Sequence, residues 1–321
     1  MVQVALVGLG DIGLGAHLPA LRRHPDVDVA AVVDPVAERA LATGLESVDL
    51  ADVLASDLPA VVLATPPWVT PDLAVRCLQA GKYVLAEKPV ATSVAAAAVY
   101  DVLTGAERAR LQIGLTYRHD PAIQQFGRWL REGRLGGPLL VRAHIYDEVG
   151  SGDAEHEARI VGALGHGPPV VHEGAHVFDW LRFLLGSGPS SIDDAWVVRT
   201  DESLPAPNLT GARLSYPGGH VALVEYGWLT AALPRCEVSV LGADGLAALD
   251  GDSFRLTLTT RAGTEVAEYD GERVPRCFDL QVRRFVDLVR GRGPAEPSLA
   301  DGLAALITAE SVATMVKETP G

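Results

Sequence analysis

The sequence predicts an α/β protein in which a doubly wound parallel sheet is followed by an α+β domain with an open, largely antiparallel sheet. Over residues 1–118, short apolar runs alternate with helical patterns, which is typical of βαβ units. From about Asp120 the pattern changes, and strand-length runs later follow one another with turn residues between them. A chain of 321 residues also accommodates two cores. We therefore expect domains at 1–118 and 119–321.

Five runs of strand length are expected in the first domain, each apolar on both faces, as in a parallel sheet that is covered on both sides. They are Val2–Val7, Val29–Val33, Ala60–Ala64, Tyr83–Ala86 and Leu111–Leu115. Ala- and Leu-rich stretches between them, such as Leu73–Ala80 and Ser93–Leu103, predict helices. Pro19 falls inside the expected first helix, so we expect a kink or a restart there.

The second domain is expected to combine helices with an antiparallel or mixed sheet. It begins with a helix at Pro121–Glu132 that ends at Gly133, followed by a strand at Leu139–Tyr146. Residues 147–169 are rich in glycine and acids and predict an irregular excursion near the site, before an amphipathic helix at Val171–Leu185. Five strands and two closing helices follow: Asp194–Arg199, Leu209–Tyr216, His220–Trp228, Glu237–Leu241 and Phe254–Thr259, then Phe278–Arg290 and Leu299–Val316.

Composition and charge exclude several classes of protein. The formal net charge of −14, with no basic run, argues against nucleic-acid binding, which needs lysine and arginine against phosphates. No apolar run approaches the roughly 20 residues of a membrane helix, and the first residues lack the pattern of a secretory signal. Cys77, Cys236 and Cys277 are widely separated without CxxC spacing, so no disulfide framework or thiolate zinc site is expected. A reducing, cytoplasmic location fits these features.

A glycine-rich turn directly follows the first expected strand. Gly8-Leu9-Gly10-Asp11-Ile12-Gly13 matches the GxGxxG pattern and opens an expected helix. The first glycine allows the tight turn, the second lets the backbone approach a pyrophosphate, and the third allows close packing of helix on strand. The helix N-terminus offers N–H groups to the anion. In this context the motif predicts a dinucleotide-binding site.

An acidic residue at the end of the second expected strand indicates which dinucleotide binds. Asp34 lies 21 residues beyond the last glycine of the motif. Its carboxylate would accept hydrogen bonds from the adenosine ribose hydroxyls and would repel a 2′-phosphate, which favours NAD over NADP. Arg39 lies close enough along the chain to soften this preference, so NADP stays an alternative.

Besides the glycine turn, several short segments stand out, above all Glu87-Lys88-Pro89 after the fourth expected strand. The others include Ala64-Thr65-Pro66-Pro67, Ala80–Val84, Tyr117-Arg118, Gly133–Pro138, Gly174-Ala175-His176 and Arg235–Val238. With these segments the chain resembles the Gfo/Idh/MocA oxidoreductase family, the glucose–fructose oxidoreductase and inositol dehydrogenase group, over most of its length. The Glu-Lys-Pro tripeptide is quite specific, whereas each of the other segments is modest evidence.

The resemblance implies a Rossmann domain followed by an α/β domain whose open sheet commonly forms an oligomer interface, so a homodimer or homotetramer is expected. It also implies that Lys88 contacts the substrate oxygen beside the nicotinamide, with Glu87 near the nicotinamide ribose, and that the Lys88–Pro89 bond can be cis. Lys88 also follows a parallel strand, at the edge where open α/β sheets bind ligands. An ammonium there can polarise a carbonyl or hold an alkoxide.

Three further residues complete the expected cofactor contacts. Thr65 and Pro66 follow the third expected strand, in one of the segments that resemble the family. Arg118 follows the fifth expected strand and is expected to reach the nicotinamide or the substrate. A surface salt bridge is the alternative explanation for Arg118.

Two histidines in the second domain admit two interpretations. As a bare motif, His172-Glu173-x-x-His176 is the HExxH pattern of zinc proteases, but Gly174 would weaken the helix and no clear third ligand follows, so we expect no metal. In the register of the family, His176 matches the histidine that acts as general acid/base on the substrate hydroxyl. His172 stands where an aspartate is usual. It either relays protons to Lys88 or His176, or it marks a substrate unlike the common sugars.

The sequence as a whole predicts an NAD(P)-dependent oxidoreductase that moves a hydride between nicotinamide and a secondary alcohol or ketone of a sugar- or cyclitol-like small molecule. Lys88 would orient and polarise the oxygen, His176 would move the proton, and His172 would modulate both. Three alternatives stay open: a redox-neutral epimerase or glycoside-cleaving enzyme with tightly bound NAD, an imine reductase, and a cofactor-sensing binding module without turnover.

Overall fold

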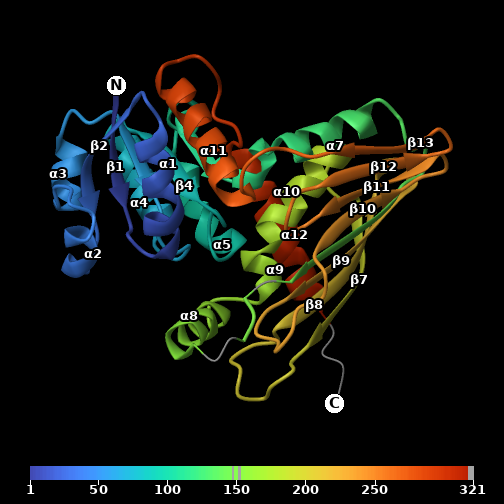
Figure 1. The fold of residues 1–321 in the computed structure, drawn as a ribbon. Coiled ribbons are helices and arrows are strands. Elements are labelled where there is room, and N and C mark those ends of the chain that lie inside the picture. The colour runs from blue at the N-terminus through green and yellow to red at the C-terminus, as the bar shows by residue number, and fades with distance from the viewer. Residues whose placement is uncertain (147, 151–152, 317–321) are drawn as a thin grey trace. The chain divides into compact units, whose positions relative to one another are not determined.

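The computed structural model describes residues 1–146, 148–150 and 153–316 (Figure 1). Its contacts divide the chain into two compact units. The first contains Met1–Asp120 and Gly271–Leu303, and the second contains Pro121–Asp270 and the chain from Ala304 onward. A simple division after residue 118 does not describe this return of the chain, in which residues 271–303 pack with the N-terminal residues.

In the described part of the chain, the first unit has a sheet of five parallel strands in the order β2-β1-β3-β4-β5. The strands are β1 (Val2–Val7), β2 (Val27–Val33), β3 (Ala60–Leu63), β4 (Tyr83–Glu87) and β5 (Leu111–Gly114), which confirms the five expected strands and the doubly wound α/β class. The strand order reverses beside β1. Doubly wound sheets bind ligands at such a point, outside the carboxyl ends of the strands.

Helices connect these strands. The helix α4 (Thr70–Gln79), and the pair formed by α5 (Val94–Ala97) with the 3₁₀ helix η2 (Ala98–Val102), confirm the two helical stretches expected there. Shorter helices were not predicted, because one or two turns show too little of the 3.6-residue period to be recognised. These are α2 (Ala37–Leu41), α3 (Leu50–Ala55), α6 (Gly105–Arg108) and the 3₁₀ helix η3 (Thr116–His119).

The helical chain after the glycine turn changes its geometry next to Pro19. Gly13–His17 forms a π-helical segment, η1, and the α-helix α1 (Leu18–Arg23) begins directly after it, with Pro19 in its first turn. Proline lacks the N–H that an α-helix interior needs, and its ring crowds the carbonyl four residues earlier; a wider turn accommodates both. The expected restart is confirmed, and His17 becomes the last residue of the wide turn.

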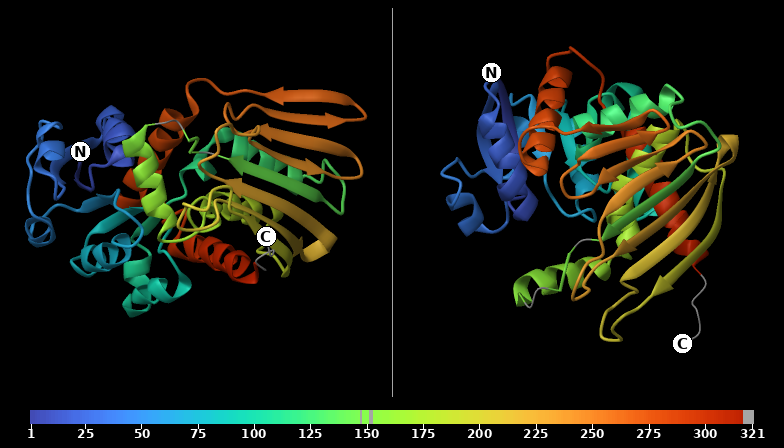
Figure 2. Two further views of the ribbon diagram at one scale, coloured as in Figure 1. Left: turned by 90° about the horizontal axis from the view of Figure 1, so that it is seen from below. Right: turned by 45° about the vertical axis from the view of Figure 1, so that its right-hand side comes forward.

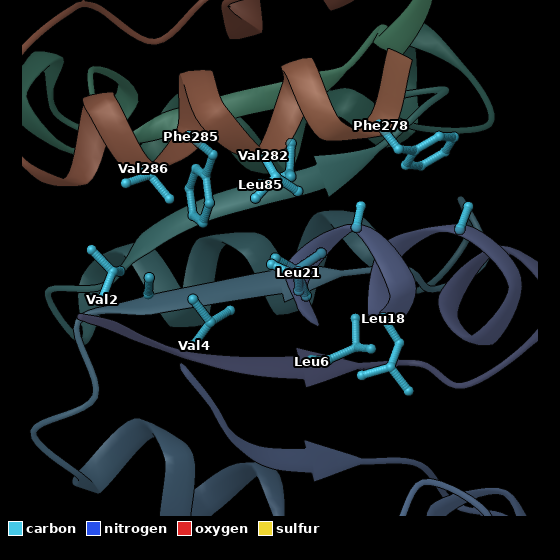
Figure 3. Close-up of a cluster of buried hydrophobic side chains, with 14 of the residues drawn as sticks. Val2, Val4, Leu6, Leu18, Leu21, Leu85, Phe278, Val282, Phe285 and Val286 are labelled. Carbon is cyan, nitrogen blue, oxygen red and sulfur yellow. The ribbon is translucent and has the colours of Figure 1, made fainter. Parts of the chain in front are cut away.

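A long helix from late in the chain, α11 (Arg273–Val289), packs on the first unit (Figure 3). Its apolar face meets side chains of β1, α1 and β4. The labelled members of this cluster are Val2, Val4, Leu6, Leu18, Leu21, Leu85, Phe278, Val282, Phe285 and Val286. Because α11 is amphipathic, the sequence predicted a helix at Phe278–Arg290, but periodicity cannot tell which sheet such a helix will cover.

The described part of the second unit contains an eight-stranded sheet in the order β13-β12-β11-β10-β6-β9-β8-β7. Its β6 and β9 pair in parallel and its other neighbours are antiparallel, which confirms the open, largely antiparallel sheet. Strands that match expected runs are β6 (Leu140–Tyr146), β7 (Ser191–Val198), β8 (Leu209–Tyr216), β9 (His220–Gly227), β10 (Glu237–Leu241) and β12 (Leu256–Thr260). The sequence missed β11 (Gly245–Asp250) and β13 (Gly263–Ala267), which are rich in residue types with low strand propensity.

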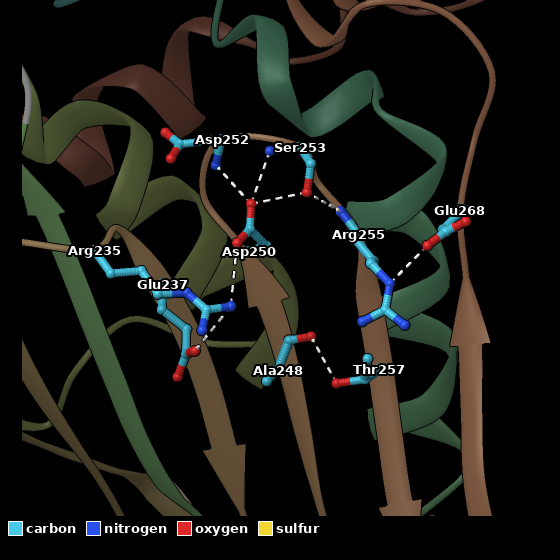
Figure 4. A network of polar contacts seen from close by, with 9 residues as sticks. All are labelled: Arg235, Glu237, Ala248, Asp250, Asp252, Ser253, Arg255, Thr257 and Glu268. Atoms are coloured by element: carbon cyan, nitrogen blue, oxygen red, sulfur yellow. Dashed lines mark hydrogen bonds and ion pairs between the residues drawn. The ribbon is translucent and has the colours of Figure 1, made fainter.

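The turn that joins β11 to β12 is built around Asp250 (Figure 4). One of its carboxylate oxygens accepts hydrogen bonds from the N–H and the hydroxyl of Ser253, both at 2.8 Å, and the other accepts from Arg235 at 3.1 Å. The Ser253 amide above all holds the pKa of Asp250 below its ordinary value, although burial opposes this. An aspartate that accepts from amides just ahead of it stabilises a turn, so Asp250 helps to close the hairpin that the sequence missed.

The helices of the second unit include α7 (Pro121–Arg131), which confirms a predicted helix, and most of α12 (Leu299–Met315). The prediction of an irregular excursion over residues 147–169 is wrong for its middle part. There α8 (Ala154–Leu164) forms a helix of 11 residues, while Asp147 lies outside the described residues. The pattern over 147–169 was weak because α8 buries few side chains, among them Ile160 and Leu164.

One expected helix of the second unit is two helices in the structure. The prediction of a continuous helix at Val171–Leu185 is wrong, because α9 (Pro169–His172) ends before Glu173 and α10 (Gly174–Leu185) begins after it. The break precedes Gly174, whose lack of a side chain weakens a helix. The helices α7 and α10 pack against each other on one face of the sheet (Figures 1 and 2). Among the described residues, no helix has both the length and the apolar character that a membrane crossing requires.

Candidate active site

The three glycines of the turn after β1 meet three different surroundings. Gly8 has φ +91°, and a Cβ there would lie 2.4 Å from the carbonyl oxygen of Ala64. A Cβ on Gly13 would lie 2.1 Å from the carbonyl oxygen of Gly8, whereas a Cβ on Gly10 would meet no atom within 4 Å. The first and third glycines are therefore required by packing, and the second leaves open space beside the backbone. That open space fits a pyrophosphate at the start of a helix.

Between the glycines, Leu9 is buried whereas Asp11 and Ile12 are exposed. Leu14 N–H donates to the Gly10 carbonyl at 2.9 Å, so the helix is under way directly after the turn. Asp11 and Ile12 lie at the surface, and Ile12 has 45% of its surface exposed. An exposed large apolar side chain at a turn that fits a dinucleotide is a candidate contact for that ligand.

Asp34, directly after β2, is tied to the glycine turn. Its Oδ2 accepts from Leu9 N–H at 2.7 Å, its Oδ1 accepts from Val36 N–H at 2.8 Å, and its side chain is 3% exposed. Arg39 Nη1 lies 3.9 Å from Oδ1 on a side chain that is 48% exposed. Two amides thus fix the carboxylate beside the turn, which suits the predicted contact with a ribose, and Arg39 lies next to it as the sequence suggested.

The segment after β3 lies against the same turn. The methyl group of Thr65 lies 3.0 Å from where a Gly8 Cβ would be. The Thr65 hydroxyl lies 2.7 Å from the hydroxyl of Thr70, and that hydroxyl also donates toward the carbonyl of Pro66 at 3.0 Å. The first turn of α4 therefore fixes Thr65 and Pro66 beside the glycines, so this predicted group of residues is assembled within one unit.

The Glu87-Lys88-Pro89 tripeptide begins at the carboxyl end of β4. Glu87 Oε1 lies 2.7 Å from His17 Nε2, and its Oε2 accepts from the backbone N–H of Lys88 at 3.1 Å. Lys88 is half-buried, and the Lys88–Pro89 bond is cis, as expected. Glu87 is buried and committed to neighbours in its own unit, while Lys88 stands at the sheet edge where ligands bind.

Sequence reasoning missed His17. The signal was available, because this histidine stands four residues beyond Gly13, the last glycine of the GxGxxG motif, and between apolar neighbours. A polar residue on such a face is buried only with a hydrogen-bond partner, but nothing in the sequence pointed to Glu87, which is 70 residues away.

Arg118 forms an ion pair within the first unit. Its Nη2 lies 3.2 Å from Asp301 Oδ1, and the two side chains are 15% and 20% exposed. Burial tends to raise the pKa of Asp301, but the Arg118 charge and hydrogen bonds from Ser298 outweigh it and lower that pKa. The alternative of a salt bridge therefore describes part of what Arg118 does, and its contact with cofactor or substrate stays a prediction.

The two histidines of the second unit lie on different helices. His172 ends α9, and His176 lies in the first turn of α10, where its N–H donates to the Glu173 carbonyl at 3.0 Å. Both are buried, with 6% and 9% of their surfaces exposed. The HExxH motif of zinc proteases needs one continuous helix. Among the described residues there is also no cluster of three or more His, Cys, Asp or Glu side chains that could hold a metal ion.

Aromatic rings pack against both histidines. The ring of Trp228, directly after β9, lies 5.4 Å from that of His172, and the ring of Trp180 lies 6.4 Å from that of His176. Trp228 also packs against Ile160 and Leu164 of α8. Trp228 was not singled out from the sequence, and α8 was not predicted. Trp228 therefore packs on His172 and also on α8.

The structure therefore assembles the predicted residues in two groups. The first unit brings together the glycine turn, Asp34 and Thr65, and it places Glu87 and Lys88 at the same sheet edge. The second unit places His172 and His176 one after the other around the α9–α10 junction. That Lys88 and His176 act on one substrate atom stays a prediction.

Comparisons with known proteins match residues of both units. The family model described as an oxidoreductase family with an NAD-binding Rossmann fold matches residues 2–115, and that of the GFO/IDH/MocA C-terminal domain matches residues 123–248. Inositol 2-dehydrogenase 4 of Saccharopolyspora erythraea is 30% identical over 97% of this chain and 92% of its own. D-apiose dehydrogenase of Paraburkholderia graminis is 27% identical over 98% and 87%. The crystal structure of myo-inositol 2-dehydrogenase from Lactobacillus plantarum has the same fold, with a TM-score of 0.83 at 19% identity over 98% of this chain and 96% of that one.

Proposed function

The chain belongs to the GFO/IDH/MocA family and is an NAD(P)-dependent oxidoreductase, and we propose that it transfers a hydride reversibly between nicotinamide and a secondary alcohol or ketone of a cyclitol or sugar. The observation that carries the proposal is the placement of Glu87-Lys88-Pro89 at the carboxyl end of β4, at the same sheet edge as the glycine turn. A lysine at this edge has a use in polarising a substrate oxygen that a surface lysine elsewhere would not have.

NAD is the proposed cofactor, and when bound it supplies the carbon that accepts or donates the hydride. The glycine turn with Asp11 and Ile12 would hold the pyrophosphate, and Thr65 and Pro66 would flank it. Asp34 would accept hydrogen bonds from the adenosine ribose and disfavour a 2′-phosphate. Its carboxylate is already oriented by two amides, which supports the preference for NAD. Arg39, 3.9 Å away and exposed, leaves NADP as the alternative.

The proposed chemistry moves one hydride and one proton. In the direction of oxidation, the substrate carbon loses a hydride to the cofactor and its hydroxyl loses a proton to His176, which leaves a ketone. Lys88 orients the oxygen and stabilises the negative charge that develops on it. A histidine suits the proton step because its ordinary pKa lies near neutral pH. His172 would modulate both groups.

The substrate class follows from the relatives and is limited by His172. Relatives of this chain are named for inositol and D-apiose, which are polyhydroxylated small molecules. The family usually has an aspartate where this chain has His172. A buried imidazole that packs on Trp228 offers a different set of donors and acceptors from a carboxylate. We therefore propose a cyclitol or sugar whose hydroxyls or substituents differ from those of the common polyols.

We further propose a homodimer or homotetramer assembled through the open face of the second unit's sheet. Phe178 of α10 contacts Tyr226 of β9, so α10 covers one face. Strand pairing and the alternation of side chains place a set of exposed large apolar residues on the opposite face: Trp196, Val198, Leu241, Leu246 and Val266. Exposed apolar side chains on one face are typical of a protein interface. Size-exclusion chromatography with light scattering tests this, and a monomer at micromolar concentration would refute it.

The experiment that tests the function is a panel of inositols, aminocyclitols, sugars and keto-sugars, each with NAD⁺/NADH and NADP⁺/NADPH, followed at the NADH absorbance. K88A is expected to lower kcat about 100-fold or more, with NAD⁺ affinity by calorimetry unchanged. K88R, which keeps the charge, is the matched control and should retain more activity. Unchanged turnover in K88A would refute the role of Lys88. A product formed without net change in NADH would indicate the redox-neutral alternative.

A further inference from the structure

His17 is a fully buried polar residue that the proposed mechanism does not use. It is 0% exposed and ends η1, the helical segment that starts at the glycine turn. Its neighbours along the chain, Ala16 and Leu18, are buried and apolar. A polar side chain in such surroundings destabilises the fold unless it is hydrogen-bonded. Its partner therefore indicates its role.

The partner of His17 is the carboxylate of Glu87. Nε2 lies 2.7 Å from Oε1, and since a carboxylate oxygen accepts, Nε2 carries the proton of this hydrogen bond. The other ring nitrogen, Nδ1, is buried and has no hydrogen-bond partner among the described residues. The ring meets Phe278 edge to face, with centroids 5.0 Å apart. Within the described chain, the polar contact of His17 is directed at Glu87.

Glu87 passes this contact on to Lys88. Its second oxygen accepts from the backbone N–H of Lys88 at 3.1 Å. The carboxylate is confined by Gly114 in the neighbouring strand β5, where a Cβ would lie 3.0 Å from Oε1. One buried carboxylate thus joins the helical segment that starts at the glycine turn to the backbone that carries Lys88.

We propose that His17 is a positioning residue, which fixes the Glu87 carboxylate and through it places Lys88 relative to the glycine turn. This inference rests on the proposed hydride transfer, in which Lys88 must be aligned with the substrate oxygen. A misplacement of about 1 Å at a reacting group can lower a rate about 100-fold. Since His17 and Gly13 lie at opposite ends of one short helical segment, the same contact links the seating of the cofactor phosphates to the place of Lys88.

Two substitutions of His17 separate its hydrogen bond from its bulk. H17Q can place an amide N–H where Nε2 now lies, whereas the shorter H17N reaches only the position of Nδ1. H17N is expected to lower kcat roughly 10- to 100-fold, with a smaller change in KM for the substrate that the panel identifies. H17Q should recover most of that loss. Equal losses in the two variants, at equal thermal stability, would overturn the proposal.

A double-mutant cycle tests whether His17 acts through Glu87. E87Q removes the charge that His17 holds, so H17N should add less than about a twofold loss in the E87Q background, because the two changes remove one interaction. G114A, which presses on the same carboxylate from β5, should reproduce part of the H17N defect. Additive losses in H17N/E87Q would show that His17 acts independently of Glu87.

A measurement that does not depend on turnover tests the role of His17 separately from the proposed function. Amide hydrogen exchange, read by mass spectrometry on the protein with NAD⁺, should rise in H17N for peptides that contain the Lys88 amide and stay at the wild-type level in H17Q. Peptides from β1 serve as the control, since general destabilisation would raise exchange there as well. If the wild-type protein turns over nothing on the panel, the proposed function fails. The exchange result then still decides the role of His17: equal exchange near Lys88 in H17N and wild type would refute it.

Discussion

The carboxylates at the carboxyl ends of β2 and β4 and the histidines at the α9–α10 junction have different neighbours. Asp34 and Glu87 each use both carboxylate oxygens in hydrogen bonds of 2.7 to 3.1 Å, to backbone amides and to His17. His172 and His176 lie against the rings of Trp228 and Trp180. Hydrogen bonds are directional and set the position and orientation of the two carboxylates, whereas the aromatic rings give the two histidines large apolar surfaces to pack on.

In the proposed function the two regions have different tasks. Every nicotinamide dinucleotide has the same pyrophosphate and nicotinamide, so the groups that hold these parts profit from a fixed arrangement. A region that meets the substrate must differ between relatives that act on different substrates. A short break between two helices, packed against aromatic rings, can accept new side chains without loss of the fold. The resemblance to the family implies an aspartate at the position of His172 in relatives, so His172 would be an example of such an exchange.

Replacement of His176 should lower kcat more than any other change considered. It tests whether the second unit contains a residue that the reaction requires. H176N is expected to lower kcat by roughly 100- to 10,000-fold, which is the contribution of general acid–base catalysis, while NAD⁺ affinity stays unchanged. H172N makes the same chemical change on α9 and is the matched control, expected to alter KM and substrate preference more than kcat. Initial rates over a range of pH measure both. Equal losses of kcat in the two variants would contradict this division of roles.

Two alanine substitutions in the glycine turn of the first unit separate packing from cofactor binding. G13A places a Cβ 2.1 Å from the Gly8 carbonyl oxygen, so it should lower the free energy of unfolding by about 3 kcal/mol. G10A meets no atom within 4 Å, so its stability should match the wild type. Its methyl group would stand where the pyrophosphate binds and should weaken NAD⁺ binding roughly 10-fold or more. Denaturant unfolding and calorimetry separate the two effects; tight NAD⁺ binding by G10A would show that the phosphates lie elsewhere.

The site residues whose positions could be predicted from the sequence are those that directly follow a strand. In a parallel sheet, residues that follow neighbouring strands lie at one edge. The positions of Asp34, Thr65 and Lys88 after β2, β3 and β4 were therefore predictable once the strands were recognised. The five strands were recognisable because their residues are apolar on both faces.

What could not be predicted depends on contacts between distant segments. The contact between His17 and Glu87 spans 70 residues, and α11 returns to a sheet formed by the start of the chain. The helix α8 has a weak apolar pattern, because it packs through a few residues on Trp228. The break at Glu173 was missed because an apolar pattern of helical period continues across it.

Buried histidine should make the first unit sensitive to acid. Burial lowers the pKa of His119 to about 4, helped by the charges of Arg284 and Arg118. As pH falls from the ordinary histidine pKa toward 4, His119 is protonated in the unfolded chain but stays neutral in the folded chain. The free energy of unfolding therefore falls over that range by up to about 3 kcal/mol. H119F should remove this loss and flatten the dependence of unfolding free energy on pH. H24N is the control, since the pKa of His24 is lowered less. An unchanged slope in H119F would show that other groups cause the acid sensitivity.

The smallest expected effect concerns Trp228, whose ring packs on His172. The indole Nε1 of Trp228 is buried without a hydrogen-bond partner among the described residues, so W228F should keep the ring contact with His172 and the packing on α8 at a cost of about 1 kcal/mol in unfolding free energy. Both kcat and substrate preference should stay close to the wild-type values, because the ring next to His172 is retained. A loss of several kcal/mol would mean that Nε1 makes a directed bond in solution. The ring of Trp228 would then be held beside His172 by a hydrogen bond as well as by packing, and its surroundings would resemble those of Asp34 and Glu87.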